Sequence, residues 1–270
     1  MDAAGLTCHG CGSTNVIFDA KTRVLHCNQC GSRQTYSRAT LNKNGKVVFC
    51  KQNALGFFQS GQFDKAKHYS MDILNISMDN VTALYMMAFY DEFYEKRDGS
   101  MRSFFRQADE VALEYEEVLD LQKLISASAV RLINFEKEII TLFAKNMQSN
   151  EEADDLCQMI DKVCPYFIAN RTSADFLDRE LVELYKELAE HCSIPKTCFA
   201  LLKGIETNPD SPFSDNSFYL QGKTKYFYEQ YICAVREIIE SMKDANYKAK
   251  FMAAYQSKVQ AYKAASNGTI

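Results

Sequence analysis

The chain contains little that would break a helix or span a membrane. Its 270 residues include four prolines and no tryptophan, and scarce proline favours long helices because proline disrupts a helix interior. No apolar run approaches the ~20 residues that a membrane-spanning helix needs. The N-terminal residues 1–20 lack the basic start and apolar core of an export signal. Since 47% of the residues are hydrophobic, the sequence predicts a folded cytoplasmic protein with no membrane partner.

Catalytic motifs are lacking as well. The sequence contains no glycine-rich phosphate loop, no nucleophile elbow and no His-Glu-x-x-His motif. Glu187 and His191 are four residues apart, whereas carboxylate-bridged di-iron bundles use Glu-x-x-His with a spacing of three. His68 and His191 are unpaired general-base candidates, which we interpret as structural histidines. We therefore expect no enzymatic activity and no small-molecule substrate.

Four of the ten cysteines occur in two identical motifs, here called knuckles. The first knuckle is Cys8-His9-Gly10-Cys11-Gly12 and the second is Cys27-Asn28-Gln29-Cys30-Gly31. Two thiolates in this spacing can turn onto one ion, and the glycine after each second cysteine permits the positive φ that directs backbone amides toward sulfur.

Four thiolates complete a tetrahedral site and leave no position for water or substrate. The sequence therefore predicts one structural Zn²⁺ bound by Cys8, Cys11, Cys27 and Cys30. Iron in a rubredoxin-like site would use the same four ligands. The nearby His9 and His26 are not needed as ligands, and we expect them at the surface or beside the site.

The other six cysteines show no Cys-x-x-Cys spacing; they are Cys50, Cys157, Cys164, Cys192, Cys198 and Cys233. Because the cytosol keeps thiols reduced, we expect all six to be free, small and buried on helices.

Between the knuckles, residues 15–18 and 23–26 alternate like two short strands joined by a polar turn at 19–22. A hairpin of this size cannot bury enough apolar surface to fold alone. We therefore expect the bound metal to stabilise it and the head to unfold without metal.

Residues 6–36 resemble a zinc ribbon of the transcription-factor-IIB type, a module that begins many bacterial proteins. The resemblance implies that the four knuckle cysteines are the zinc ligands. Ribbons of this kind occur in nucleic-acid-binding proteins, in polymerase-associated factors and as protein-docking modules. The resemblance therefore implies a bound metal but does not identify one function.

Residues 37–49 contain Asn44-Gly45 between short apolar groups, which predicts a linker or a second hairpin. The alternative is a basic arm that reaches nucleic-acid phosphates through Arg33, Arg38, Lys43 and Lys46. Residues 1–50 hold six basic and two acidic residues, while the whole chain has a net charge of −4. Because the remainder is acidic, it would repel a phosphate backbone, and we expect at most weak nucleic-acid binding.

From residue 50 the apolar pattern follows the helical period. Residues 50–94 resemble one tetratricopeptide unit and the first helix of another, since Gly61 would end a helix, Phe63 would pack across the turn and Ala66 would allow close helix approach. We expect further helices at 101–119, 121–148, 151–164, 174–191, 195–206, 215–242 and 245–265. The 121–148 helix would be central to the packing. A capping box at 172–175 and a loop at 208–212 complete this pattern.

Two clusters in the helical part are interpreted as ordinary structure. The acidic residues Glu110, Glu114, Glu116, Glu117 and Asp120 suggest a solvated helix face, with a site for a basic partner as the alternative. On the last helix an aromatic stripe predicts a packing seam against Tyr226, Tyr228 and Tyr231, with a partner groove as the alternative; the stripe comprises Tyr247, Phe251, Tyr255, Val259 and Tyr262.

The sequence thus predicts a small β zinc ribbon at 1–36, a linker or hairpin at 37–49 and an all-α domain at 50–270, built as an α-solenoid or an irregular bundle. The leading functional hypothesis is a non-enzymatic zinc-binding adaptor whose helical part binds protein. The alternative is a nucleic-acid- or polymerase-associated factor that acts through the ribbon.

Overall fold

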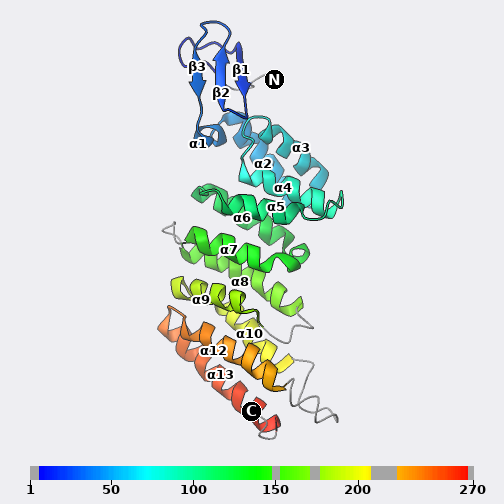
Figure 1. Cartoon of the computed structure of the whole chain (residues 1–270), viewed down its shortest axis with the longest axis vertical. Helices are drawn as coiled ribbons and strands as arrows, with labels where there is room; N and C mark the ends of the chain where they lie inside the picture. Colours follow the sequence, from blue (N-terminus) through cyan, green and yellow to red (C-terminus); the bar gives the residue numbers. More distant parts are fainter. Residues whose placement is uncertain (1–5, 148–152, 171–176, 208–223, 267–270) are drawn as a thin grey trace. The chain divides into compact units, whose positions relative to one another are not determined.

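A computed structural model describes residues 6–147, 153–170, 177–207 and 224–266. The chain forms two compact units, residues 1–127 and 128–270. A small antiparallel sheet begins the first unit, and all later elements are helical (Figure 1). This confirms the predicted fold class. Among the described residues, no helix combines the length and apolar character needed to cross a bilayer.

The sheet contains β1 (Val16–Asp19), β2 (Val24–Cys27) and β3 (Arg33–Thr35) in that order, with both pairs antiparallel. Along β1 and β2, Val16, Phe18 and Leu25 are buried, which is the alternation of a sheet with one solvated face. The hairpin predicted at 15–26 is confirmed. The third strand was not predicted, because its three polar residues carry no apolar signal.

Residues 37–49 form helices, so the prediction of a linker or a second hairpin was wrong. The helices are α1 (Arg38–Asn42) and α2 (Gly45–Gln59). The Asn44 side chain accepts hydrogen bonds from the backbone N–H groups of Lys46 and Val47. Asn44 is therefore the N-cap of α2 and not a turn residue. Since α2 runs through position 50, the ribbon joins the helical part without a linker.

Three more helices follow in the region where the sequence suggested a tetratricopeptide unit: α3 (Phe63–Leu74), α4 (Val81–Phe93) and α5 (Ser100–Asp109). Gly61 has a φ of +75° between α2 and α3. The Phe63 ring lies 5.1 Å from that of Phe58 and 5.3 Å from that of Phe89, and Ala66 is 1% exposed. These three residues occupy the structural positions expected of them. The helix α5 supplies a second member for the hairpin that α4 begins.

The helices predicted at 101–119 and 121–148 were both wrong in extent. The structure has α5, then α6 (Tyr115–Ser128), two short 3₁₀ turns (Ala129–Arg131 and Ile133–Phe135) and α7 (Glu136–Met147). No single long helix occupies this region.

Residues that are distant in sequence contact the chain at or beside both breaks. At the first break, Arg38 Nη1 donates to the carbonyl of Ala112 at 3.4 Å. At the second, the hydroxyl of Tyr185 donates to the buried carboxylate of Glu136 at 2.5 Å. These contacts hold the chain where no proline or glycine marks a helix end.

The second unit contains α7 and five further α-helices among the described residues, together with a π-helical turn at Tyr228–Ile232. These helices are α8 (Ala153–Asn170), α9 (Arg179–His191), α10 (Pro195–Thr207), α12 (Cys233–Glu240) and α13 (Ala245–Ala265). The predictions at 195–206 and 245–265 are confirmed. The helix predicted at 151–164 continues through Pro165, and α9 begins later than predicted because Asp178 caps it. The capping box at 172–175, the loop at 208–212 and residues 215–223 lie outside the described residues.

The aromatic stripe on α13 is largely a packing seam, as expected. Phe251 is fully buried, with its ring centroid 4.9 Å from that of Phe199. Tyr262 is also buried, with its ring 5.9 Å from that of Phe227. The ring contacts of the stripe therefore include Phe199 and Phe227, which were not predicted, while Tyr226 stays 45% exposed.

The expectation that all six remaining cysteines are free was wrong. Cys157 on α8 and Cys192 at the end of α9 form a disulfide, and both are buried. Burial shields this bond from soluble reductants. The spacing of 35 residues gave no sequence signal, because the fold alone brings the two thiols together.

We expect loss of this disulfide to destabilise the second unit. A cross-link between residues 35 apart restricts the unfolded chain and contributes about 4 kcal/mol in the loop-entropy description. The double variant Cys157→Ala, Cys192→Ala should therefore show a lower urea midpoint for amide-exchange protection in residues 128–270. Cys198→Ala, which removes a buried free thiol, is the matched control. Equal midpoints for the double variant and the wild type would contradict the prediction.

Candidate metal centre

The two knuckles have the same backbone structure. In the first, the N–H of Gly12 donates to the carbonyl of Cys8 at 2.7 Å; in the second, the N–H of Gly31 donates to the carbonyl of Cys27 at 2.9 Å. Gly12 has a φ of +71° and Gly31 a φ of +70°. Residues other than glycine rarely adopt this left-handed backbone conformation. The glycine in each motif therefore has the backbone role that the sequence predicted.

The four sulfur atoms form one compact cluster. All four lie within 4.8 Å of one another, with 3.6 Å between Cys8 Sγ and Cys30 Sγ and 3.6 Å between Cys11 Sγ and Cys27 Sγ. Zinc–sulfur bonds of ~2.3 Å in a tetrahedron place the sulfurs ~3.8 Å apart. Disulfides would require ~2.05 Å. The cluster therefore has dimensions that fit one tetrahedrally bound ion.

Each knuckle contributes one buried and one exposed cysteine. Cys8 and Cys27 are buried, while Cys11 and Cys30 are exposed. An ion held by these four sulfurs would therefore lie at the edge of the ribbon, between its small core and solvent. Among the described residues, this is the one group of three or more Cys, His, Asp or Glu side chains close enough to share an ion.

In the metal-free cluster, the pKa values of individual cysteines are shifted in opposite directions. Hydrogen bonding by the Ser32 side chain lowers the pKa of Cys8 to about 6, with help from backbone N–H groups in the knuckle, and it also lowers the pKa of Cys30. For Cys11 the backbone hydrogen bond at Ser13 acts in the same direction. Desolvation and the neighbouring thiols outweigh that bond and raise the pKa of Cys11 to about 12. Four thiolates at this spacing repel one another unless a cation lies between them.

Ser32 and Gln34 support the cluster and were not predicted. Ser32 Oγ lies 3.0 Å from Cys8 Sγ and 3.2 Å from Cys30 Sγ. Gln34 Nε2 donates to Cys8 Sγ at 3.4 Å, and its Oε1 accepts from the backbone N–H of His9 at 3.1 Å. A signal for the serine was present, since serine follows the glycine in both knuckles, at positions 13 and 32.

The two histidines beside the knuckles do not join the sulfur cluster. His26 lies on β2 opposite Ile17, and His9 Nε2 lies 3.3 Å from the hydroxyl of Tyr36. That hydroxyl donates to the carbonyl of Thr7 at 3.1 Å. These contacts tie the first knuckle to the segment that leads into α1.

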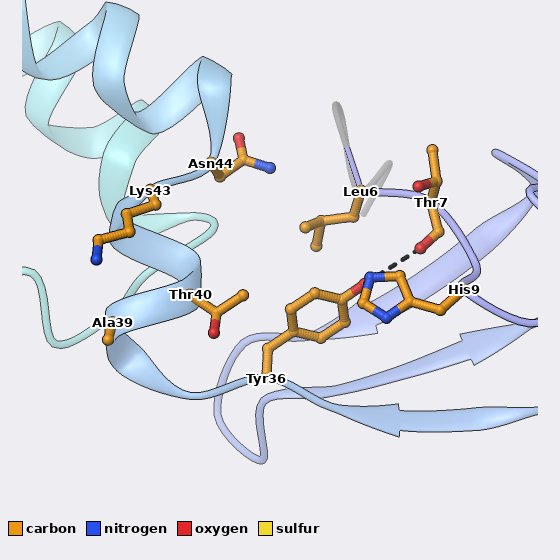
Figure 2. A pocket seen from close by; sticks show the side chains of 8 residues that line it. All are labelled: Leu6, Thr7, His9, Tyr36, Ala39, Thr40, Lys43 and Asn44. Atoms are coloured by element: carbon orange, nitrogen blue, oxygen red, sulfur yellow. Dashed lines mark hydrogen bonds between the residues drawn. The ribbon is translucent and has the colours of Figure 1, made fainter.

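A cleft of about 390 Å³ separates this part of the ribbon from α1 and the start of α2. Figure 2 shows the rings of Tyr36 and His9 together on one side and Thr40 and Asn44 on the other, while Lys43 points away from Leu6 and His9. The Lys43 ammonium and the rings of Tyr36 and His9 therefore do not face one common position in the cleft.

One residue of the candidate basic arm, Arg38, forms an ion pair within the first unit. The Arg38 guanidinium forms an ion pair with the carboxylate of Glu117 on α6, and only 14% of the Arg38 side chain and 4% of the Glu117 side chain are exposed. Arg33, Lys43 and Lys46 remain exposed. The interpretation of the acidic cluster as a solvated face was therefore wrong for Glu117, and also for Asp120, which is buried and paired with Lys51 at 2.8 Å.

The remaining candidate histidines are separate from the cysteine cluster. His68 is exposed on α3 beside the ring of Tyr69, and His191 is the last residue of α9, four residues after Glu187. The structure does not bring either histidine into a metal-ligating group within the described ranges.

No protein-family model, curated protein or solved structure matches this chain. The resemblance to the zinc ribbon and to the tetratricopeptide unit therefore rests on the residues and geometry described above.

Proposed function

We propose that Cys8, Cys11, Cys27 and Cys30 bind one structural zinc ion. The supporting observation is the closed set of four sulfurs, which lie within 4.8 Å of one another and include two pairs at 3.6 Å, close to the ~3.8 Å edge of a zinc tetrathiolate. With four protein ligands, such an ion offers no open position for substrate. The role of the metal is then to fold the ribbon, and iron is the competing occupant because it accepts the same ligands.

We further propose that the chain is a non-enzymatic adaptor and that its helices bind protein. In the first unit, α2 with α3 and α4 with α5 form successive hairpins of the kind that repeat proteins use as binding surfaces. Large apolar side chains are exposed on this unit, with Phe49 at 61%, Met71 at 51% and Met78 at 52%. Exposed apolar side chains of this size provide contact area for a partner.

The second candidate function is association with nucleic acid through the ribbon. The observation in its favour is a set of exposed cations near the sheet and the first helices, namely Lys21, Arg33, Lys43 and Lys46. Arg38 is not available for phosphate contacts because Glu117 holds it. So few phosphate contacts would give weak binding, whose salt dependence is limited because it scales with the number of contacts.

Affinity capture with the full-length, zinc-loaded chain separates the two functions. The double variant Phe49→Glu, Met71→Glu changes the exposed apolar side chains, and Arg33→Glu, Lys46→Glu reverses two exposed cations. Val130→Glu, at a residue that is 64% exposed in the second unit, is the matched control for an added charge. The adaptor proposal expects protein partners that survive nuclease and are lost only with the first double variant.

Loss of all partners on nuclease treatment, or only with the Arg33→Glu, Lys46→Glu variant, would contradict the adaptor function and favour association with nucleic acid. An absence of any saturable partner would contradict both functions.

A further inference from the structure

A groove of about 350 Å³ lies between α4 and α5. From α4 it is lined by Leu84, Met87, Ala88 and Asp91. Their spacing of three, four and seven residues places them on one face of the helix. The first three are only half-buried. They therefore form an apolar strip that an occupant can reach, with a carboxylate at its end.

The wall contributed by α5 has the same spacing and a different chemistry. Ser103 and Gln107 offer a hydroxyl and an amide group, whereas the hydroxyl of Ser100 donates to the carbonyl of Arg97 at 2.8 Å. The buried Phe104 also lines this wall. Because only residues 94–99 connect α4 and α5, the two helices run antiparallel. The start of α5 therefore lies beside the end of α4, and the groove has distinct ends.

The end of the groove near the connecting loop is acidic. Asp91 and Asp98 line it, and no lysine or arginine is among the described residues that line the groove. The Asp91 carboxylate lies 3.4 Å from Arg97, but the Arg97 side chain is 65% exposed, and exposed ion pairs of this kind are weak. Asp98 is exposed. A cation from outside can therefore replace Arg97 at this end.

Length and charge together define the occupant. Leu84 and Asp91 are seven residues apart, which is ~10 Å along the helix axis. A peptide in the polyproline II conformation advances ~3.1 Å per residue with three residues per turn, so residues three positions apart lie on the same face. A cationic residue at the acidic end would therefore place the residue about three positions away over the apolar strip. The hydroxyl of Ser103 and the amide of Gln107, on the opposite wall of the groove, can hydrogen-bond the backbone of such a segment.

We propose that the α4–α5 groove binds a basic peptide segment in the polyproline II conformation in which arginine or lysine is followed or preceded, about three residues away, by a leucine-sized apolar residue. This inference rests on the proposed adaptor function, for which it specifies the chemistry of the partner. The cation meets Asp91 and Asp98, and the apolar side chain covers Leu84 and Met87.

The test uses the full-length, zinc-loaded chain and a fluorescein-labelled peptide of glycine and serine that contains arginine and leucine with two residues between them. Fluorescence anisotropy gives the dissociation constant. We expect Asp98→Lys to weaken binding by at least about tenfold, because like charges then face each other. We expect Met87→Ala to weaken it by a few fold through loss of apolar contact.

Matched controls are Glu110→Lys, an exposed acid just after α5, and Val130→Ala, at an exposed apolar residue of the second unit. Both should bind like the wild type, and peptides that lack either the arginine or the leucine should bind more weakly. Equal weakening by Glu110→Lys and Asp98→Lys would mean diffuse charge attraction and would overturn the proposal, as would undetectable binding of the intact peptide.

Affinity capture with Asp98→Lys separates the failure of this inference from that of the proposed function. If partners are still captured but the peptide does not bind, the groove assignment fails and the adaptor function stands. If no partner is captured by the wild-type chain, the adaptor function itself fails.

Discussion

Serine in place of Cys27 is expected to unfold the ribbon, residues 6–36, and to abolish stoichiometric zinc binding. Structural zinc contributes an apparent ~10–16 kcal/mol in small peptides near neutral pH, whereas the ribbon core is small. Its buried apolar side chains are few, and they include Leu6, Val16, Phe18 and Leu25. Such a core cannot offset the entropy of ordering the segment.

Amide hydrogen exchange measured by mass spectrometry locates this effect. In the Cys27→Ser variant, peptides that cover β1 to β3 should lose their protection. Peptides from α2 to α6 should keep it, because those helices pack on one another through residues such as Phe58, Tyr85 and Phe89. Ordered exchange in the ribbon of the variant would contradict the assignment.

Two controls separate loss of a ligand from loss of a buried side chain. Cys50→Ser removes another buried cysteine, from α2, and should keep one zinc per chain. His9→Ala and His26→Ala should also keep zinc, because neither imidazole belongs to the sulfur cluster. Loss of zinc from a histidine variant would mean that the ligand set includes nitrogen.

The second large effect is expected for Glu117→Ala. The Glu117 carboxylate pairs with Arg38, accepts from Asn42 Nδ2 at 3.0 Å and accepts from the backbone N–H of Glu114 at 3.0 Å. Asn42 in turn accepts from Ser77. Removing one member of a buried, hydrogen-bonded ion pair leaves an uncompensated charge, and we expect a loss of about 3–5 kcal/mol in the free energy of unfolding of the first unit.

Glu116→Ala is a close control, since Glu116 precedes Glu117 on the same helix and is exposed. Its effect should stay within about 0.5 kcal/mol, as for most surface substitutions. The comparison is made by amide exchange of α1 and α6 in a urea series, which resolves the first unit from the second. Equal midpoints for the two variants would show that the buried network around Glu117 does not stabilise the unit.

Glu116 and Glu117 also show what the sequence could not provide. Both are glutamates on one predicted helix, and the partner that buries Glu117 is Arg38, which is 79 residues away. The breaks near 110–114 and 129–135 also carried no local signal, because they contain neither proline nor glycine and lie beside contacts with the distant residues Arg38 and Tyr185. Helical periodicity identifies an apolar face but not the tertiary contacts that end a helix.

The cysteine cluster was more predictable because its chemistry is encoded locally. Two Cys-x-x-Cys-Gly motifs specify ligand type, spacing and backbone conformation within a few residues, and all four sulfurs meet in the structure. The supporting contacts of Ser32 and Gln34 depend on β3 pairing with β2. Those contacts, like the Cys157–Cys192 disulfide, depend on the fold more than on a motif.

X-ray absorption on the purified full-length chain tests the central claim most directly, because one spectrum identifies the metal and its ligands. The account predicts a zinc edge with four sulfur neighbours at ~2.3 Å and no nitrogen or oxygen in the ligand shell. An iron edge would assign the four cysteines to a rubredoxin-like iron site instead of a zinc site. Fewer than four sulfurs around zinc would contradict the closed structural site on which the proposed function depends.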